Sequence, residues 1–178
     1  MTPRQEELLR ASLDRVLNDL PGAIDLAAVA RCVQIGRLST LSGTQVCGGG
    51  ERIAGVLVRF AGRFPKVGLF GMEPETAFEL VRDDRGGGDP MSVYNGIGCE
   101  LVRAAATVFD PLGVTQEGNA TLREDSLVGT LLDTHAPFNT GLVSVQLTLS
   151  WVGAEASHAA HVYLLADPKP FAAAVGAG

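Results

Sequence analysis

Residues 89–109 carry the side chains with the clearest capacity for chemistry. The stretch reads DPMSVYNGIGCELVRAAATVF, and a helix turns by about 100° per residue, so one side of it collects small and polar residues. We call this set the polar strip: Ser92, Asn95, Gly96, Cys99, Glu100, Arg103 and Thr107. The amide of Asn95 can orient a water molecule, and Glu100 and Arg103 lie three residues apart, where they can pair. The strip therefore indicates either water-dependent hydrolysis or the docking of another surface.

The same residues also have structural interpretations, which the sequence leaves open. Glu100 and Arg103 would then form an ordinary solvated ion pair, Cys99 would be a small residue at a tight packing point, and Asn95 would have no role beyond the helix itself. Gly96 and Gly98 each lower helix stability by roughly 1 kcal/mol relative to alanine. We expect such glycines where packing is close or where another surface approaches the helix.

The opposite side of residues 89–109 predicts a helix that packs on a core. It carries Tyr94, Ile97, Leu101, Ala105 and Val108, flanked by Val93, Val102, Ala104 and Phe109. Asp89 followed by Pro90 is typical of a helix start, and Asp110 followed by Pro111 is typical of a helix end.

The first part of the chain predicts helices followed by a strand pair. Helical periodicity indicates a helix over 4–19 and a second over 23–41, before a glycine-rich connector, CGGGER. The β-rich runs 53–64 and 66–72 are typical of adjacent antiparallel strands, and 73–84 indicates a further helix with Pro74 in its first turn.

After Pro111 the pattern is that of strands. Residues 142–152 alternate apolar and polar side chains, and 158–166 provide the hairpin partner before DPKPF ends the sheet. Segments 112–122 and 127–133 are weaker strand candidates. Because helices and strands cluster rather than alternate singly, we expect an α+β fold with helices packed on a mixed or antiparallel sheet.

Composition narrows the class of protein. Of the 178 residues 46% are hydrophobic and 19% charged, and the formal net charge is −6, which predicts one globular domain over 1–178 and disfavours a nucleic-acid surface. No apolar run approaches a membrane span, so we expect a cytoplasmic protein.

Cofactor sites are not indicated by the sequence. The three cysteines show no CxxC pair and fit reduced thiols. His158 and His161 are three apart on a predicted strand, where they point to opposite faces, and His135 lies beside a loop. CGGGER lacks the Lys-Ser/Thr of a phosphate loop, and no G-x-S-x-G elbow occurs. We therefore expect no metal and no cofactor.

The order of segments over 53–171 resembles the CheC/CheX family of chemotaxis phosphatases, which are related to flagellar switch proteins. The matching stretches are GVLVRFAGRFPKVGLFGM, EPETAFELV, SVYNGIGCELVRAAATVF, PLGVTQEGNATL and LVSVQLTLSWVGAEASHAAHVYLL. Residues 1–45 form an N-terminal helical part outside this core. Its QIGR, residues 34–37, is similar to the later GIGC and to the pseudo-repeat of two-site family members.

The resemblance implies that the helix at 89–109 faces a response regulator. In the family an E-x-x-N motif supplies a Glu that grips the regulator's lysine and an Asn that positions water for attack on the aspartyl phosphate. When Ile97-Gly98 is aligned with the family's Ile-Gly, Gly96 and Cys99 stand at the Glu and Asn positions. When Asn95 is aligned instead, Ser92 stands at the acidic position.

From these observations we predict a signalling protein that docks a response-regulator receiver domain or another signalling protein, with altered or lost phosphatase activity. Asn95 and Glu100 are the predicted catalytic residues, and the partner would contact Ser92, Cys99 and Arg103. The alternative is a non-enzymatic ligand-binding or dimerisation module, with a homodimer formed through the strand edges at 53–60 or through the hairpin at 142–166.

Overall fold

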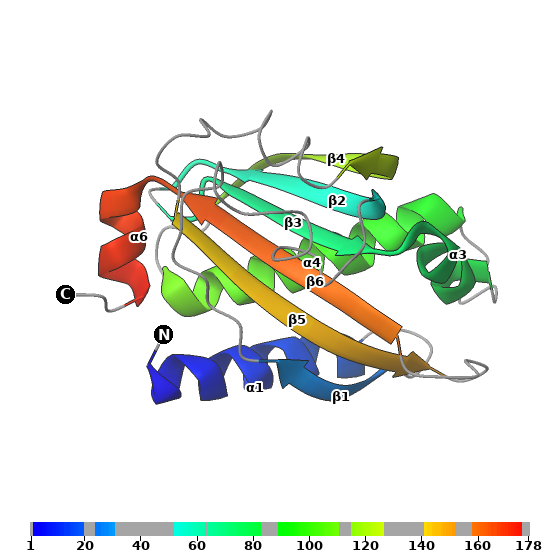
Figure 1. Ribbon diagram of the computed structural model, residues 1–178, viewed down its shortest axis with the longest axis horizontal. Coiled ribbons are helices and arrows are strands. Elements are labelled where there is room, and N and C mark those ends of the chain that lie inside the picture. The colour runs from blue at the N-terminus through cyan, green and yellow to red at the C-terminus, as the bar shows by residue number, and fades with distance from the viewer. Residues whose placement is uncertain are drawn as a thin grey trace.

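The computed structural model describes residues 2–19, 24–30, 52–62, 64–82, 89–110, 115–126, 141–151 and 158–175. In chain order the elements are α1 (Pro3–Asp19), β1 (Ile24–Ala30), β2 (Arg52–Phe60), β3 (Val67–Met72), α3 (Pro74–Arg82), α4 (Pro90–Phe109), β4 (Gln116–Ser126), β5 (Gly141–Trp151), β6 (His158–Ala166) and α6 (Pro168–Val175). Figure 1 shows α4 running behind a broad sheet, with α1 beside it and α3 and α6 at separate ends.

The described residues form one sheet of six strands in the order β1-β5-β6-β3-β2-β4, and every neighbouring pair is antiparallel. The predicted pairing of β2 with β3 is confirmed, with Leu57 opposite Leu69. The predicted hairpin of β5 and β6 is confirmed too, with Val145 opposite Val162. The α+β fold class with an antiparallel sheet is therefore confirmed.

The prediction of which strands form the edges was wrong. Strand β2 lies between β3 and β4, and the β5–β6 hairpin lies between β1 and β3. The two outer strands among the described residues are β1 and β4. Strand β2 therefore has a neighbour on both sides, and so do the described strands of the hairpin, although β1 covers β5 only from Gln146 to Trp151. A homodimer itself stays a prediction.

The predicted helix over 23–41 was also wrong where the structure describes it. Residues 24–30 form β1, which pairs antiparallel with β5 from Ile24 opposite Trp151 to Ala30 opposite Gln146. An alanine-rich run favours a helix by local propensity, but ladder bonds to a strand far along the chain outweigh that preference. The N-terminal part is thus not wholly helical, and residues 31–41 lie outside the described residues.

The remaining segment predictions have mixed outcomes. The helices predicted over 4–19 and 73–84 are confirmed as α1 and α3. The weak candidate 112–122 overlaps β4, whereas 127–133 lies outside the described residues. The chain does leave the sheet at DPKPF, but it then forms α6, which the sequence pattern did not indicate.

The core lies between the sheet and the helices. Strand β5 contributes alternate residues, since Val143, Val145, Leu147 and Leu149 are all buried, as its period-two pattern predicts. The other face of the sheet is buried as well. Its side chains include Leu57, Leu69, Tyr163 and Leu165. The sheet is therefore covered on both faces, and α4 is pressed against one of them.

Candidate docking face on helix α4

The start of α4 is fixed by the side chain of Asp89. Its Oδ2 accepts hydrogen bonds from the Ser92 backbone N at 3.0 Å and from Ser92 Oγ at 2.9 Å, and Pro90 occupies the first turn. At the other end the backbone N of Asp110 donates to the carbonyl of Ala106 at 3.1 Å. The sequence-predicted boundaries of the helix are confirmed, and Ser92 is exposed but already serves the cap.

Close packing against the sheet explains why position 98 is a glycine. A Cβ atom at this position would lie 2.6 Å from Val56 Cγ2 and 3.0 Å from Phe70 Cδ1, well inside ordinary contact distance. On the facing strand, a Cβ atom at Gly68 would collide with Val102. The helix therefore lies closer to β2 and β3 than any larger residue at these positions allows.

Gly96 has the opposite environment. A Cβ atom there would have nothing within 4 Å, and the residue is exposed. Packing inside the molecule therefore gives no reason for glycine, although the helix loses stability by having it. Gly96 therefore leaves a low point on the exposed side of α4.

The polar strip divides into an exposed part and a half-buried part. Four residues are exposed and share an arc of about 60° on a helix of 100° per residue. We call them the α4 ridge: Ser92, Gly96, Arg103 and Thr107. Asn95, Cys99 and Glu100 are half-buried at its margins. The expectation that the strip faces away from the core is confirmed for the ridge.

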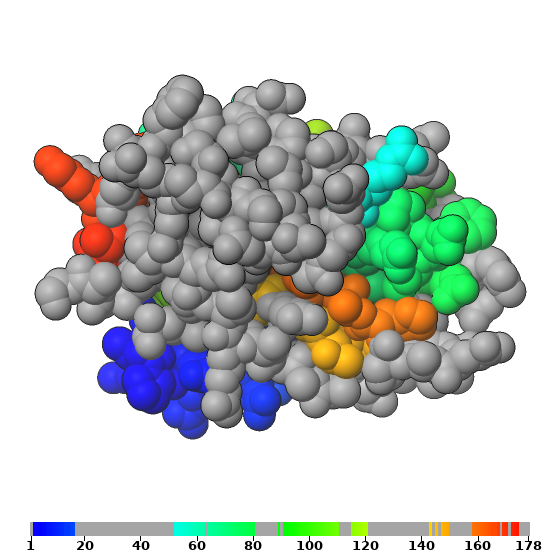
Figure 2. Space-filling model, in the orientation of Figure 1, coloured from blue at the N-terminus to red at the C-terminus, as the bar shows by residue number. Residues whose placement is uncertain are grey.

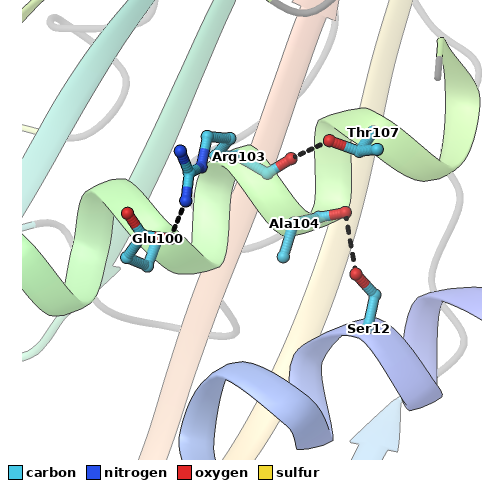
Figure 3. A network of polar contacts seen from close by, with 5 residues as sticks. All are labelled: Ser12, Glu100, Arg103, Ala104 and Thr107. Carbon is cyan, nitrogen blue, oxygen red and sulfur yellow. Dashed lines mark hydrogen bonds and ion pairs between the residues drawn. The ribbon is translucent and has the colours of Figure 1, made fainter. Parts of the chain in front are cut away.

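The charges on this face neutralise each other. Arg103 donates to the carboxylate of Glu100 from one turn further along the helix (Figure 3), and both side chains are about half exposed. Thr107 Oγ1 donates to the Arg103 carbonyl at 2.8 Å. Such an exposed pair contributes a few tenths of a kcal/mol, so its main effect is to leave the ridge without net charge.

The two predicted catalytic residues are not brought together. Asn95 and Glu100 are five positions apart, which on a helix separates their directions by about 140°. They lie on opposite margins of the ridge, and Glu100 is engaged by Arg103. An acid and an amide that act on one phosphoryl group must lie on the same face of the helix, which residues three or four positions apart do.

A neighbour that the sequence did not reveal is Asn119 on β4. Its Nδ2 donates to Cys99 Sγ at 2.9 Å, which ties the margin of the ridge to the outer strand. Asn119 pairs with Val58, a buried core residue, and paired strand residues point to the same side of a sheet. Sequence alone could not give this register, so Asn119 escaped notice.

The other margin of the ridge is covered by α1. Ser12 Oγ donates to the carbonyl of Ala104 at 3.3 Å (Figure 3), while Leu9 and Leu13 are buried. Gln5 Nε2 also donates to the carbonyl of Ala174 at 2.6 Å, which links α1 to α6. The ridge is thus a narrow strip bounded by α1 on one side and by Asn119 of β4 on the other.

Titratable groups near the sheet are not poised for proton transfer at the ridge. Tyr94 is buried, its hydroxyl donates to the Ala54 carbonyl at 2.8 Å, and burial raises the pKa of this phenol, so it stays neutral. Burial lowers the pKa of His161, whose ring stacks on Tyr163 with centroids 5.8 Å apart. Within the described ranges no cluster of three or more His, Cys, Asp or Glu could hold a metal ion.

These features define a class: an antiparallel α+β domain with one long helix held tightly to the sheet and a low-profile ridge facing outward. No family model matches the chain, and no curated protein matches it in sequence. No helix in the part of the chain described is long and apolar enough to cross a membrane.

Solved structures share this architecture. FliM in the FliM–SpeE complex from H. pylori matches with a TM-score of 0.57 at 13% identity over 99% of this chain and 97% of that chain. FliY from Thermotoga maritima matches with a TM-score of 0.53 at 12% identity over 99% and 96%. The FliG–FliM complex from H. pylori gives 0.52 at 12% identity over 92% and 94%. The chain has the CheC/CheX/FliM-like fold, and the resemblance predicted from its sequence is confirmed at the level of the fold.

Proposed function

We propose that this chain is a chemotaxis or flagellar signalling domain that docks a response-regulator receiver domain on the α4 ridge. One observation carries the proposal: the ridge is exposed and flat at Gly96, where the fold itself gives no reason for glycine. A shallow helix surface is suited to close contact with a second helix or strand, because small residues let backbones approach.

The choice of partner class rests on the fold and on the family resemblance. Two of the similar structures are FliM in complexes, one with SpeE and one with FliG, so the fold is one that other proteins bind. The CheC/CheX resemblance implies a receiver domain on the helix that corresponds to α4. Because Glu100 and Arg103 neutralise each other, the ridge would contact a receiver domain through complementary shape and hydrogen bonds rather than through net charge.

Docking is better supported than hydrolysis. Removal of an aspartyl phosphate needs an aligned water and a group that holds the regulator in place. Asn95 remains the residue proposed to orient water, but Glu100, its proposed partner, lies on the other margin and is paired with Arg103. We therefore propose altered or lost phosphatase activity, with Ser92, Cys99 and Arg103 as contact residues.

The test is a calorimetric titration of this chain with receiver domains from the same organism, with and without beryllofluoride as the phosphoryl mimic. Gly96→Arg places a long side chain on the ridge and should abolish binding without lowering the melting temperature. Ala173→Arg puts the same side chain at an exposed position of α6 and should bind like wild type. Absence of binding to every receiver, or equal binding by Gly96→Arg, would refute the proposal.

Catalysis is tested separately by phosphate release from the phosphorylated receiver. If wild type accelerates release, Asn95→Ala should slow it while leaving both binding and the melting temperature unchanged. A lower melting temperature in that variant would instead assign Asn95 a structural role.

A further inference from the structure

Strand β4 contains a β-bulge beside the α4 ridge. Asn119 lies opposite Val58 and Gln116 lies opposite Phe60, so three steps along β4 match two steps along β2. The extra residue is Glu117, which faces no residue of β2 in this register. A bulge of this kind changes the side of the sheet to which the side chains beyond it point, and bulges often serve to aim a side chain at a functional site.

The bulge brings two amide side chains to the same side of the sheet. Residues three apart on a regular strand point to opposite sides. Asn119 points toward α4, as its hydrogen bond to that helix shows. Gln116 points to the same side, because cross-strand partners share a side and its partner Phe60 packs beside Val102 of α4, where both would touch a Cβ atom at Gly68.

Both amides are exposed and have hydrogen-bonding capacity to spare. A side-chain amide offers two N–H donors and a carbonyl acceptor. Asn119 uses one donor, to Cys99 Sγ at 2.9 Å, and this bond holds its amide beside the ridge. The side chain of Gln116 forms no hydrogen bond with any residue in the described ranges. Neither amide is therefore saturated by the fold.

We propose that the docking face continues from the α4 ridge onto β4, where Asn119 and Gln116 hold the partner by hydrogen bonds to its peptide groups. The inference rests on the proposed function, since the partner is the receiver domain that docks on the ridge. An amide side chain presents a donor and an acceptor next to each other, as a peptide group does, so it pairs well with an exposed loop or strand end. The ridge supplies shape, and the two amides add specificity, because a partner without matching groups would leave them unpaired.

The ridge and the two amides face the same direction of approach. Strand β4 is an outer strand among those described, and Figure 1 shows it at the upper edge of the sheet with α4 behind. In Figure 2, which views the side of the sheet opposite α4, β4 (yellow-green) is visible only as a small area at the upper rim. A partner that approaches α4 from its exposed side therefore meets β4 as well.

Asn119→Arg and Ala120→Arg form a matched pair of variants that tests the inference. Both positions are exposed and adjacent on β4, but Ala120 lies opposite Leu57 and points to the other side of the sheet. In the calorimetric titration with receiver domains carrying beryllofluoride, Asn119→Arg should abolish binding and Ala120→Arg should bind like wild type. Gln116→Arg should abolish binding too, and it breaks no side-chain hydrogen bond within the described ranges.

Smaller changes separate contact with the partner from a structural role. Asn119→Ala and Gln116→Ala should each weaken binding by about two- to tenfold, the effect of one lost hydrogen bond, and Gln116→Ala should keep the wild-type melting temperature. In wild type the side-chain NH₂ signals of both residues should shift in nitrogen-15 NMR spectra when the receiver is added. A residue that only stabilises β4 would show no such shift.

The outcomes separate this inference from the proposed function. Equal binding by Asn119→Arg and wild type, equal losses in Asn119→Arg and Ala120→Arg, or side-chain amide signals that stay unchanged when the receiver binds would each overturn the extension onto β4. Docking on the α4 ridge would then stand alone. Absence of wild-type binding to every receiver would refute the proposed function and this inference together.

Discussion

Replacing Gly96 and Gly98 by alanine gives a matched pair of variants that tests how α4 is seated. Both positions lie within the same helix, so both should gain about 1 kcal/mol in helix propensity. At Gly96 nothing lies within 4 Å of the added methyl group, so the gain should appear in full as increased stability. At Gly98 the methyl would lie 2.6 Å from Val56 Cγ2 and 2.8 Å from Val56 Cβ, in the middle of β2.

The clash at Gly98 should outweigh the propensity gain. Overpacking a well-packed core costs about 1–3 kcal/mol, and Val56 is fully buried, so it has little room to move. The difference between the two variants cancels the propensity term and should equal that cost. For a chain of this size about 1 kcal/mol shifts the melting temperature by about 2–4 °C.

Thermal and denaturant unfolding of the two variants and wild type would measure this difference. We expect Gly96→Ala to melt above wild type. Gly98→Ala should melt below wild type, or at the same temperature if the clash costs only about 1 kcal/mol. If Gly98→Ala is stabilised as much as Gly96→Ala, the close seating of α4 on β2 is refuted.

Three more predictions follow from single contacts. Asp89→Ala removes the acceptor for Ser92 and should cost about 1 kcal/mol in urea unfolding; an unchanged midpoint would show that the cap is dispensable. Tyr94→Phe loses the buried bond to Ala54 and should cost about 1 kcal/mol, against about 3–5 kcal/mol for Tyr94→Ala; equal losses would contradict this packing. His161 has a pKa lowered by burial below its ordinary 6.5, so below that pH the unfolded state binds more protons than the folded state and stability falls as pH decreases. His161→Gln should weaken this acid-side loss of melting temperature relative to wild type, and identical pH profiles would refute the assignment.

The elements with strong local patterns were predictable from the sequence. Asp89-Pro90 and Asp110-Pro111 bracket α4 because caps and proline restrictions act within a few residues. Alternation over β5 placed its apolar side chains correctly, because burial of one strand face needs no knowledge of the neighbouring strand. The exposed side of α4 followed from helical spacing in the same way.

Features that depend on distant contacts were not predictable. The alanine-rich residues 24–30 form a strand because β5 offers them a ladder, and strand order decided that β4 rather than β2 lies at the edge. Asn119 reaches Cys99 only through the register of β4 on β2. The opposing roles of Gly96 and Gly98 likewise required knowledge of what faces each residue.

The most direct test of the α4 ridge as a docking face is to follow the backbone amide signals of the chain by NMR while a receiver domain carrying beryllofluoride is added. The account predicts that the largest shifts fall on residues 92–107, with Gly96 among them, and that residues of α6 stay unchanged. Binding that shifts other surfaces and leaves Gly96 and its neighbours unchanged would contradict it.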